Sequence, residues 1–248
     1  MKTEVIYVGN VPVKLFTGEN ASRSVLAVHG FGGNKDSLAI EGLAERLCGE
    51  GFRVAAPDLP CHGERTEPER MLTPERCLSD ILAVENRLRE QGGEVSAFGT
   101  SFGACLLLKR MELYGNLFRR VVLRVPAVEM AGSMLRCIRL FQPDFTLEDA
   151  KKDGFRVKMS KELVLPYEFY KRLTELNEVR HCDIWDSPDV LAIYSGRDEL
   201  VARADTEEFL RLNPRIQRLC IEESGHRMLR PEHLAVALDR AAEHILLQ

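Results

Sequence analysis

The chain has 248 residues, of which 45% are hydrophobic and 29% are charged, and this length and composition predict one soluble globular domain with a sizeable core. Acidic side chains number 38 and basic ones 34, so the formal net charge is -4 and the pI is about 5.9. A dedicated nucleic-acid binder normally carries a clustered basic excess, so we expect no nucleic-acid partner.

Targeting segments and metal clusters are not indicated by the sequence. The apolar runs are strand-sized, and the N-terminal stretch 1–10, interrupted by Glu4, has no signal-peptide core. We therefore expect no membrane span and a cytoplasmic protein. Seven cysteines are scattered singly without a CxxC pair, which disfavours a disulfide framework and a structural zinc site. We expect them to be reduced and mostly buried.

Short β-branched runs alternate with amphipathic helical stretches along nearly the whole chain, which is typical of an α/β fold with a largely parallel sheet and helices on both faces. The eight expected strands are 4–8, 11–16, 25–28, 54–56, 95–98, 121–125, 190–194 and 217–221. The expected helices are 37–49, 74–91, 102–113, 204–212 and 231–247. The first two strands flank Gly9-Asn10, a hairpin signal, so they should be antiparallel to each other.

The interval 127–185, between the sixth and seventh expected strands, is far longer than one crossover helix needs. We interpret it as a small cap inserted within the single domain 1–248. The interval holds seven of the chain's 17 aromatic residues, namely Phe141, Phe145, Phe155, Tyr167, Phe169, Tyr170 and Trp185. This enrichment indicates that the cap covers an apolar site, that it packs a small core of its own, or both.

A nucleophile motif follows the fifth expected strand. The sequence Gly99-Thr100-Ser101-Phe102-Gly103 is a G-x-S-x-G motif in strand-turn-helix context. On so sharp a turn, the residues two before and two after the serine approach neighbouring backbone closely, and glycine avoids the collision. We therefore assign Ser101 as the nucleophile and Gly99 and Gly103 as elbow glycines. The alternative is a glycine-rich turn with a bystander serine.

An alcohol is a poor nucleophile at neutral pH, so Ser101 needs a base, and the base needs a group that holds its tautomer. Of six histidines we assign His226, which stands in a loop just past the last strand. Asp198, after the seventh strand, is our choice of orienting acid because sites of open α/β sheets lie at the carboxyl edge. Glu199 and Glu129 are the rival acids. The chain order of these three residues matches G-x-S-x-G hydrolases and not the chymotrypsin or subtilisin types.

The third expected strand ends in the small-residue run HGFGGN at 29–34, where a second oxyanion donor should arise. We predict that the backbone N–H groups of Phe31 and Phe102 form the oxyanion hole. The alternative is a phosphate cradle. Because Lys35 stands where G-x-G-x-x-G needs its third glycine, and no G-x-x-x-x-G-K-[ST] run exists, we expect no nucleotide cofactor.

From about residue 5 to the C-terminus, these features resemble the α/β-hydrolase fold superfamily. They are HGFGG at 29–33, PDLPCHGE at 57–64, the Ser101 elbow, GRD at 196–198 and SGH at 224–226. The second run is similar to the D-x-P-G-H-G-x-S loop of many members. Here Cys61 replaces the motif's glycine and Arg65 its serine, a departure that should alter loop shape without touching the chemistry.

Within this superfamily the chain is most similar to small intracellular esterases of the cinnamoyl esterase and monoacylglycerol lipase-like kind, grouped with serine aminopeptidase-type hydrolases. The resemblance implies a small-molecule carboxylic ester substrate, cleaved by a Ser-His-Asp triad through an acyl-enzyme, without metal or cofactor. A peptidase, thioesterase or lysophospholipase would use the same triad, and a non-catalytic ligand-binding protein is a further alternative. For the substrate pocket we predict Gly30, Gly32, Tyr167 and Tyr170.

Overall fold

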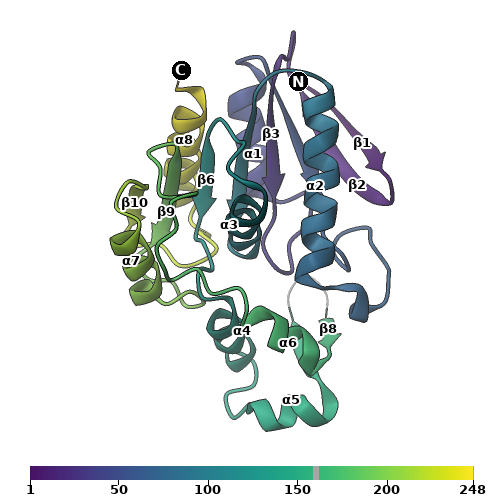
Figure 1. The fold of residues 1–248 in the computed structure, drawn as a ribbon, viewed down its shortest axis with the longest axis vertical. Coiled ribbons are helices and arrows are strands. Elements are labelled where there is room, and N and C mark those ends of the chain that lie inside the picture. Colours follow the sequence, from purple (N-terminus) through teal and green to yellow (C-terminus); the bar gives the residue numbers. More distant parts are fainter. Residues whose placement is uncertain (159–161, 248) are drawn as a thin grey trace.

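A sheet of eight strands runs through the centre of the molecule, seen in a computed structural model that describes residues 1–158 and 162–247 (Figure 1). The strands are β1 (Lys2–Val8), β2 (Val11–Thr17), β3 (Arg23–Val28), β4 (Phe52–Pro57), β5 (Val95–Thr100), β6 (Val121–Arg124), β9 (Val190–Ser195) and β10 (Gln217–Ile221). Their spatial order is β1-β2-β4-β3-β5-β6-β9-β10. β2 is antiparallel to both of its neighbours, and the other neighbouring pairs are parallel. The predicted eight-stranded, mostly parallel sheet is confirmed.

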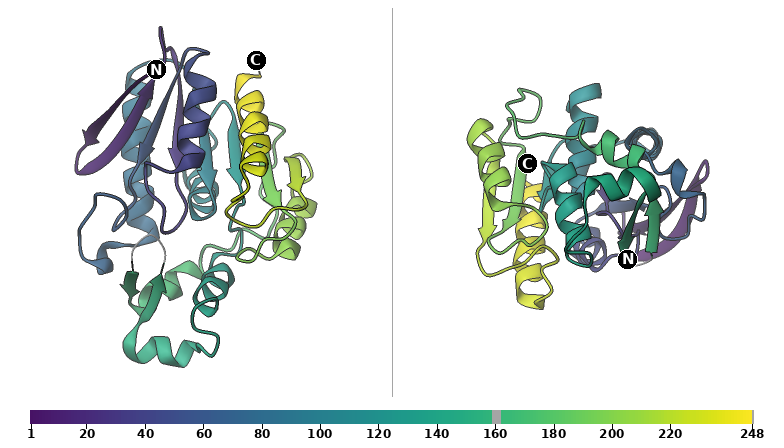
Figure 2. Two further views of the ribbon diagram at one scale, coloured as in Figure 1. Left: turned by 180° about the vertical axis from the view of Figure 1, so that it is seen from behind. Right: turned by 90° about the horizontal axis from the view of Figure 1, so that it is seen from below.

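Helices cover both faces of this sheet (Figure 2). One face carries α1 (Leu38–Cys48) and α8 (Pro231–Leu246), and the other carries α2 (Pro74–Glu90), α3 (Phe102–Tyr114) and α7 (Arg203–Leu212). Side chains alternate between the faces along each strand, so Leu26 and Val28 pack toward α2 and α3 while Val25 and Ala27 pack toward α1 and α8. Burial on both faces explains the continuous apolar runs, whose predicted ends are correct within two residues.

The 127–185 segment lies at the carboxyl edge of the parallel strands, in the lower part of Figure 1. It contains α4 (Met130–Arg139), α5 (Leu147–Asp153), β7 (Phe155–Lys158), β8 (Glu162–Leu165) and α6 (Tyr167–Leu173). β7 and β8 pair antiparallel, and the short helix η1 (Glu69–Met71) lies beside β8. Residues 159–161 of this predicted cap lie outside the described residues. The segment's buried side chains, including Phe155, Phe169 and Trp185, continue the core under α2 and α3.

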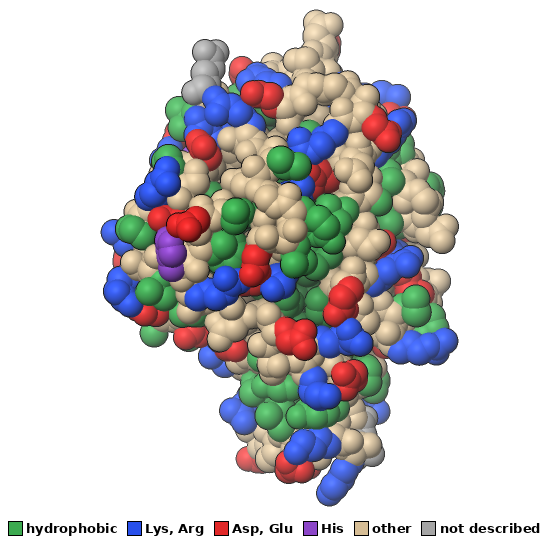
Figure 3. Space-filling model, in the orientation of Figure 1, with side chains coloured by type: hydrophobic (Ala, Val, Ile, Leu, Met, Phe, Trp, Pro, Cys, Tyr) green, Lys and Arg blue, Asp and Glu red, His purple; other side chains and the backbone are tan. Residues whose placement is uncertain are grey.

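The surface carries charges of both signs in close alternation on the face shown in Figure 3. Apolar side chains gather on the part of that face formed by the 127–185 segment. Within the described ranges, no helix is both long enough and apolar enough to cross a membrane. The seven cysteines are thiols and all lie in described parts of the chain, and five of them are buried, as expected from the sequence.

Candidate active site

Ser101 occupies the turn between β5 and α3 with a backbone φ of 53° and ψ of -112°. A positive φ is unfavourable for a residue with a Cβ, so the surrounding structure must hold it. The Ser101 N–H donates to the Arg124 carbonyl oxygen at 2.9 Å, and the Ser101 carbonyl accepts from the Cys105 N–H at 3.1 Å. The turn is therefore fixed to β6 on one side and to α3 on the other.

The two elbow glycines lie where a larger side chain has no room. A Cβ built at Gly99 would lie 2.7 Å from the Ala104 Cα, and one at Gly103 would lie 2.4 Å from the Val28 carbonyl oxygen. Both contacts are with backbone atoms, which cannot move aside without shifting a strand or helix. The spacing of the G-x-S-x-G motif thus has the steric cause expected from the sequence.

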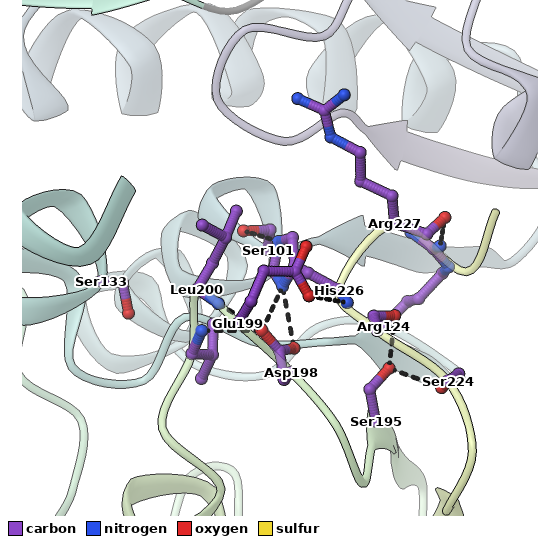
Figure 4. A network of polar contacts seen from close by, with 12 residues as sticks. Ser101, Arg124, Ser133, Ser195, Asp198, Glu199, Leu200, Ser224, His226 and Arg227 are labelled. Atoms are coloured by element: carbon purple, nitrogen blue, oxygen red, sulfur yellow. Dashed lines mark hydrogen bonds and ion pairs between the residues drawn. The ribbon is translucent and has the colours of Figure 1, made fainter. Parts of the chain in front are cut away.

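His226 and Asp198 extend from Ser101 in a hydrogen-bonded row (Figure 4). The Ser101 Oγ donates to His226 Nε2 at 3.0 Å, and His226 Nδ1 lies 2.8 Å from Asp198 Oδ2 and 3.0 Å from Oδ1. A carboxylate only accepts hydrogen bonds, so the proton belongs on Nδ1, and Nε2 is left to accept from the serine. The side chains of His226 and Asp198 are buried, and the two residues stand in loops that follow β10 and β9. This arrangement can remove the proton of the Ser101 hydroxyl.

The structure separates the three candidate acids by their partners. Asp198 bonds the His226 ring, and its Oδ1 also accepts two backbone N–H groups of the following loop at 2.9 and 2.7 Å. Glu199 instead accepts the backbone N–H of His226 at 2.9 Å. Glu129 caps α4 by accepting a backbone N–H of its first turn at 2.8 Å. The ring of His226 is therefore oriented by Asp198.

Two backbone N–H groups beside Ser101 have no hydrogen-bond partner among the described residues. Neither the Phe31 N–H nor the Phe102 N–H donates to another described residue. Phe102 is the first residue of α3, so the positive end of that helix dipole adds to its N–H. A Cβ at Gly30 would lie 3.3 Å from the Ser101 Cβ, which shows how closely the loop carrying Phe31 approaches the serine.

Two other histidines brace that loop. His29 Nδ1 donates to the Gly30 carbonyl at 2.8 Å while its Nε2 accepts the Leu59 N–H at 3.1 Å. His62 Nε2 accepts the Gly32 N–H at 2.9 Å. Burial lowers the pKa of His29 to about 4, because the charged ring would lose its hydration. His29 thus stays neutral near pH 7 and serves to hold the 29–34 loop against the 57–65 loop.

The two departures from the D-x-P-G-H-G-x-S pattern fall in this second loop. Cys61 stands at the glycine position with a φ of 61°, a left-handed value that glycine adopts easily. Arg65 stands at the serine position, where it forms an ion pair with Asp80 and donates to the Asp58 carbonyl at 3.2 Å. Neither Cys61 nor Arg65 is among the described residues that line the cavity at Ser101.

Ser101 and His226 open into a cavity of about 740 Å³. One part of its wall, formed by α4 and the loop after β9, is mostly apolar and includes Met130, Met134, Cys137, Leu200 and Val201. Another part, formed by α1, α8 and the loop before α8, includes Leu38, Gly42, Met228, Leu234 and Leu238. In the described ranges, no three His, Cys, Asp or Glu side chains are grouped so that they could hold a metal ion.

The predicted pocket residues divide into two pairs. Gly30 and Gly32 line the cavity, whereas Tyr167 and Tyr170 are not among its described lining residues, contrary to the sequence prediction. The two tyrosine rings stack at 6.1 Å, and Tyr170 meets the Phe155 ring edge-on at 6.4 Å. These rings of α6 therefore pack within the 127–185 segment, so its aromatic enrichment reflects internal packing at this point.

Sequence reasoning missed Arg124, the last residue of β6, which also lines the cavity. Its side chain is buried, and burial lowers its pKa to about 10, which still leaves the guanidinium charged at neutral pH. A signal was present, because Arg124 interrupts the apolar run VVLRV of a strand that is buried on both faces. An arginine at such a place needs a charge partner or a ligand.

Comparison with solved structures shows the same fold in several hydrolases. Est1E from Butyrivibrio proteoclasticus, solved with ferulic acid bound, is similar with a TM-score of 0.80 at 18% identity, covering 98% of each chain. Alpha/beta hydrolase domain-containing protein 10 from mouse gives 0.76 at 12% identity over 99% of this chain and 98% of that one. The Pyrococcus furiosus esterase Pf2001 gives 0.70 at 17% identity over 98% and 91%. At these identities the likeness shows the fold alone.

Sequence comparison gives the family. A comparison with curated proteins yields no match. Residues 25–239, which include the elbow, both neighbouring loops and His226, match the alpha/beta hydrolase family over most of the chain. The fold, the strand-turn-helix setting of Ser101 and this match agree, and the chain belongs to the alpha/beta hydrolase family.

Proposed function

We propose that this protein is a serine hydrolase that cleaves carboxylic esters. The observation that carries the proposal is the hydrogen-bonded row of Ser101, His226 and Asp198, which ends at a largely apolar cavity. A hydroxyl held at 3.0 Å from a neutral imidazole nitrogen meets the geometric requirement for general-base activation of a nucleophile.

In the proposed reaction, Ser101 Oγ attacks the ester carbonyl while His226 Nε2 takes the hydroxyl proton. The C–O bond to the alcohol then breaks, and His226 gives the proton to the leaving alkoxide, which departs as the alcohol. Water repeats the sequence, with His226 as base, and the acyl-enzyme is hydrolysed to the free acid. Asp198 stays ionised and stabilises the imidazolium that forms in each half.

Negative charge develops on the carbonyl oxygen during both attacks. We assign the N–H groups of Phe31 and Phe102 as its donors, because both lie beside Ser101 and neither is used by another described residue. One such donor typically contributes about 2.7–4 kcal/mol of transition-state stabilisation. Loss of the Phe31 donor should therefore lower kcat about 10²–10³-fold.

The 127–185 segment is proposed as the cap of this site. Its helix α4 supplies Met130 and Met134 to the cavity wall, and these flexible thioethers suit an apolar substrate group. The names of two similar structures, an esterase and a ferulic acid complex, support the ester reading over the peptidase, thioesterase and lysophospholipase alternatives. No metal or cofactor has a part in this mechanism.

A fluorophosphonate probe and a panel of p-nitrophenyl esters of graded acyl length, extended by hydroxycinnamate esters, test the proposal. Wild-type protein is expected to take up one probe molecule and to hydrolyse members of the panel, whereas Ser101→Ala should do neither. Labelling that persists in folded Ser101→Ala would contradict the nucleophile assignment. Normal ester turnover by His226→Ala would contradict the base assignment. Labelling combined with uniformly negligible ester hydrolysis would favour the thioesterase or peptidase alternative.

A further inference from the structure

Arg124 carries a buried charge that forms no ion pair with a carboxylate of the described residues. The residue is only 4% exposed, and no Asp or Glu of the described chain forms an ion pair with its guanidinium. Its Nη2 donates a single hydrogen bond, to the Arg227 carbonyl at 3.0 Å, and its Nε is buried without a partner (Figure 4). Burying a guanidinium in this way is costly unless an anion compensates it.

The backbone of Arg124 lies beside the nucleophile. Arg124 is the β6 partner of Thr100, and its carbonyl accepts the Ser101 N–H. It lines the same cavity as Ser101 and His226. Asp198 is the carboxylate whose charge acts on Arg124, but Asp198 is already bonded to His226 and to two backbone N–H groups.

Arg227 adds a second guanidinium to the cavity wall. It follows His226 directly, and its side chain makes no hydrogen bond or ion pair with the part of the chain that the structure describes (Figure 4). The remaining charged lining residues belong to α1, and two of them are already paired. Glu41 accepts from Lys14 at 2.7 Å, and Arg46 is bonded to Asp239 at 2.7 Å.

We propose that Arg124 forms an anion subsite for an ester substrate that carries a carboxylate, with Arg227 as a second contact. This inference rests on the proposed function and names its substrate class. The carboxylate belongs either to the acid part of the ester, as in a dicarboxylic acid hemi-ester, or to the alcohol part. The apolar wall at α4 then receives the uncharged end of the substrate.

A purely structural role for Arg124 would be to hold the loop after His226 through the Arg227 carbonyl. The two roles differ in one measurable respect. A displaced His226 slows the hydrolysis of every ester in the same proportion, whereas loss of an anion subsite slows only the charged esters. The ratio of kcat/KM between a charged ester and its neutral counterpart therefore separates them.

The test uses two matched pairs of esters. The acid-side pair is p-nitrophenyl hemi-glutarate and p-nitrophenyl hexanoate, and the alcohol-side pair is the butyrate of 4-hydroxybenzoate and that of 4-hydroxybenzamide. Wild type should prefer the charged member of one pair, and Arg124→Met should reduce that charged-to-neutral ratio about tenfold or more. Arg124→Lys, which keeps the charge but loses the planar fork, should retain part of the preference.

Arg197→Met is the matched control. Arg197 is exposed, paired with Glu223, and lies outside the described cavity lining, yet it neighbours Asp198 in sequence. The Arg197→Met substitution removes one positive charge from the same region, and the charged-to-neutral ratio of kcat/KM should stay at the wild-type value. No preference in either wild-type pair, an unchanged ratio in Arg124→Met, or an equal change in Arg197→Met would each overturn the subsite.

A binding measurement keeps this result separate from the proposed ester hydrolysis. At 10 mM, 4-phenylbutyrate should raise the melting temperature of wild type and of Arg197→Met, and 4-phenylbutyramide should not. Loss of this shift in Arg124→Met supports the subsite even if no ester is hydrolysed. An equal shift in wild type and Arg124→Met overturns it. If Arg124→Met does not fold, Arg124→Lys and Arg227→Gln replace it, and unchanged ratios in both overturn the subsite.

Discussion

Glu199 Oε2 accepts the backbone N–H of His226 at 2.9 Å, while the adjacent Asp198 bonds the ring of the same histidine. Two consecutive carboxylates thus hold His226 at its backbone and at its imidazole. A Cβ built at Gly225 would lie 2.8 Å from Glu199 Oε2, so the glycine before His226 leaves room for that carboxylate. With a side chain at position 225, the Glu199 carboxylate would have to shift from its present place.

Replacing Glu199 by alanine should lower kcat for p-nitrophenyl butyrate about 10- to 100-fold, because one charge-assisted hydrogen bond to a backbone N–H contributes about 1.5–3 kcal/mol. Glu199→Gln keeps an acceptor oxygen in place and should retain most of the activity. Steady-state kinetics of both variants, with melting temperatures as the folding control, measure this. Equal losses in the two variants would show that the hydrogen bond to His226 is not the cause.

Replacing Asp198 by asparagine should lower kcat by about 10³–10⁴, because an amide neither stabilises the imidazolium nor enforces the Nδ1–H tautomer. The melting temperature should change far less than the rate. Turnover of p-nitrophenyl butyrate and circular dichroism on the same preparation give both values. A loss below tenfold would move the orienting role away from Asp198.

Replacing Gly103 by alanine should destabilise the fold by about 1–3 kcal/mol or more, because its Cβ would lie 2.4 Å from the Val28 carbonyl oxygen. Gly49 provides the matched control. It ends α1 with φ of -64°, nothing lies within 4 Å of its Cβ position, and Gly49→Ala should be neutral or stabilise by about 0.4–1 kcal/mol. Urea unfolding of the two variants measures the difference, and similar midpoints would refute the steric account of the elbow.

Acidification should destabilise the protein through His29. Its folded-state pKa of about 4 lies below the usual 6.5, so between these values the unfolded chain binds a proton that the folded chain does not. Stability from this group is fully present above pH 6.5 and is lost as the pH falls toward 4, by about 3 kcal/mol.

The measurement is urea unfolding of wild type and His29→Gln from pH 7 to pH 4. Glutamine cannot be protonated, so the stability difference between the two proteins should shrink by that amount as the pH falls. His244, whose pKa burial also lowers, contributes equally to both proteins and cancels. Parallel curves would show that His29 does not carry this pH dependence.

Much of the fold followed from the sequence because local patterns and tertiary packing agree. The runs 25–28 and 121–123 are apolar because both faces of a parallel sheet are buried. The elbow was predictable because its glycines are fixed by contacts within a few residues and one neighbouring strand. The placement of Asp198 beside His226 follows from the shared carboxyl edge of β9 and β10.

Other features depend on contacts that no local pattern encodes. Tyr167 and Tyr170 are aromatic, as a pocket wall could be, but their rings stack on each other and Tyr170 meets Phe155. Glu129 was a candidate acid by its place after a strand, and only the start of α4 reveals its capping bond. The sequence shows Arg124 only as a charge within an apolar run, because the lack of an ion-pair partner among the described residues is a property of the folded chain.

The hydrogen bond from the Ser101 N–H to the Arg124 carbonyl joins the backbone of the nucleophile to the backbone that carries the guanidinium. The spacing between the attacked carbonyl and a bound carboxylate is then set by β5 and β6, and motion of the 127–185 segment leaves it unchanged. For hemi-esters of dicarboxylic acids, kcat/KM would then be highest at one number of methylene groups and lower for both shorter and longer acids. The geometry of β5 and β6 would then determine which substrate length is preferred.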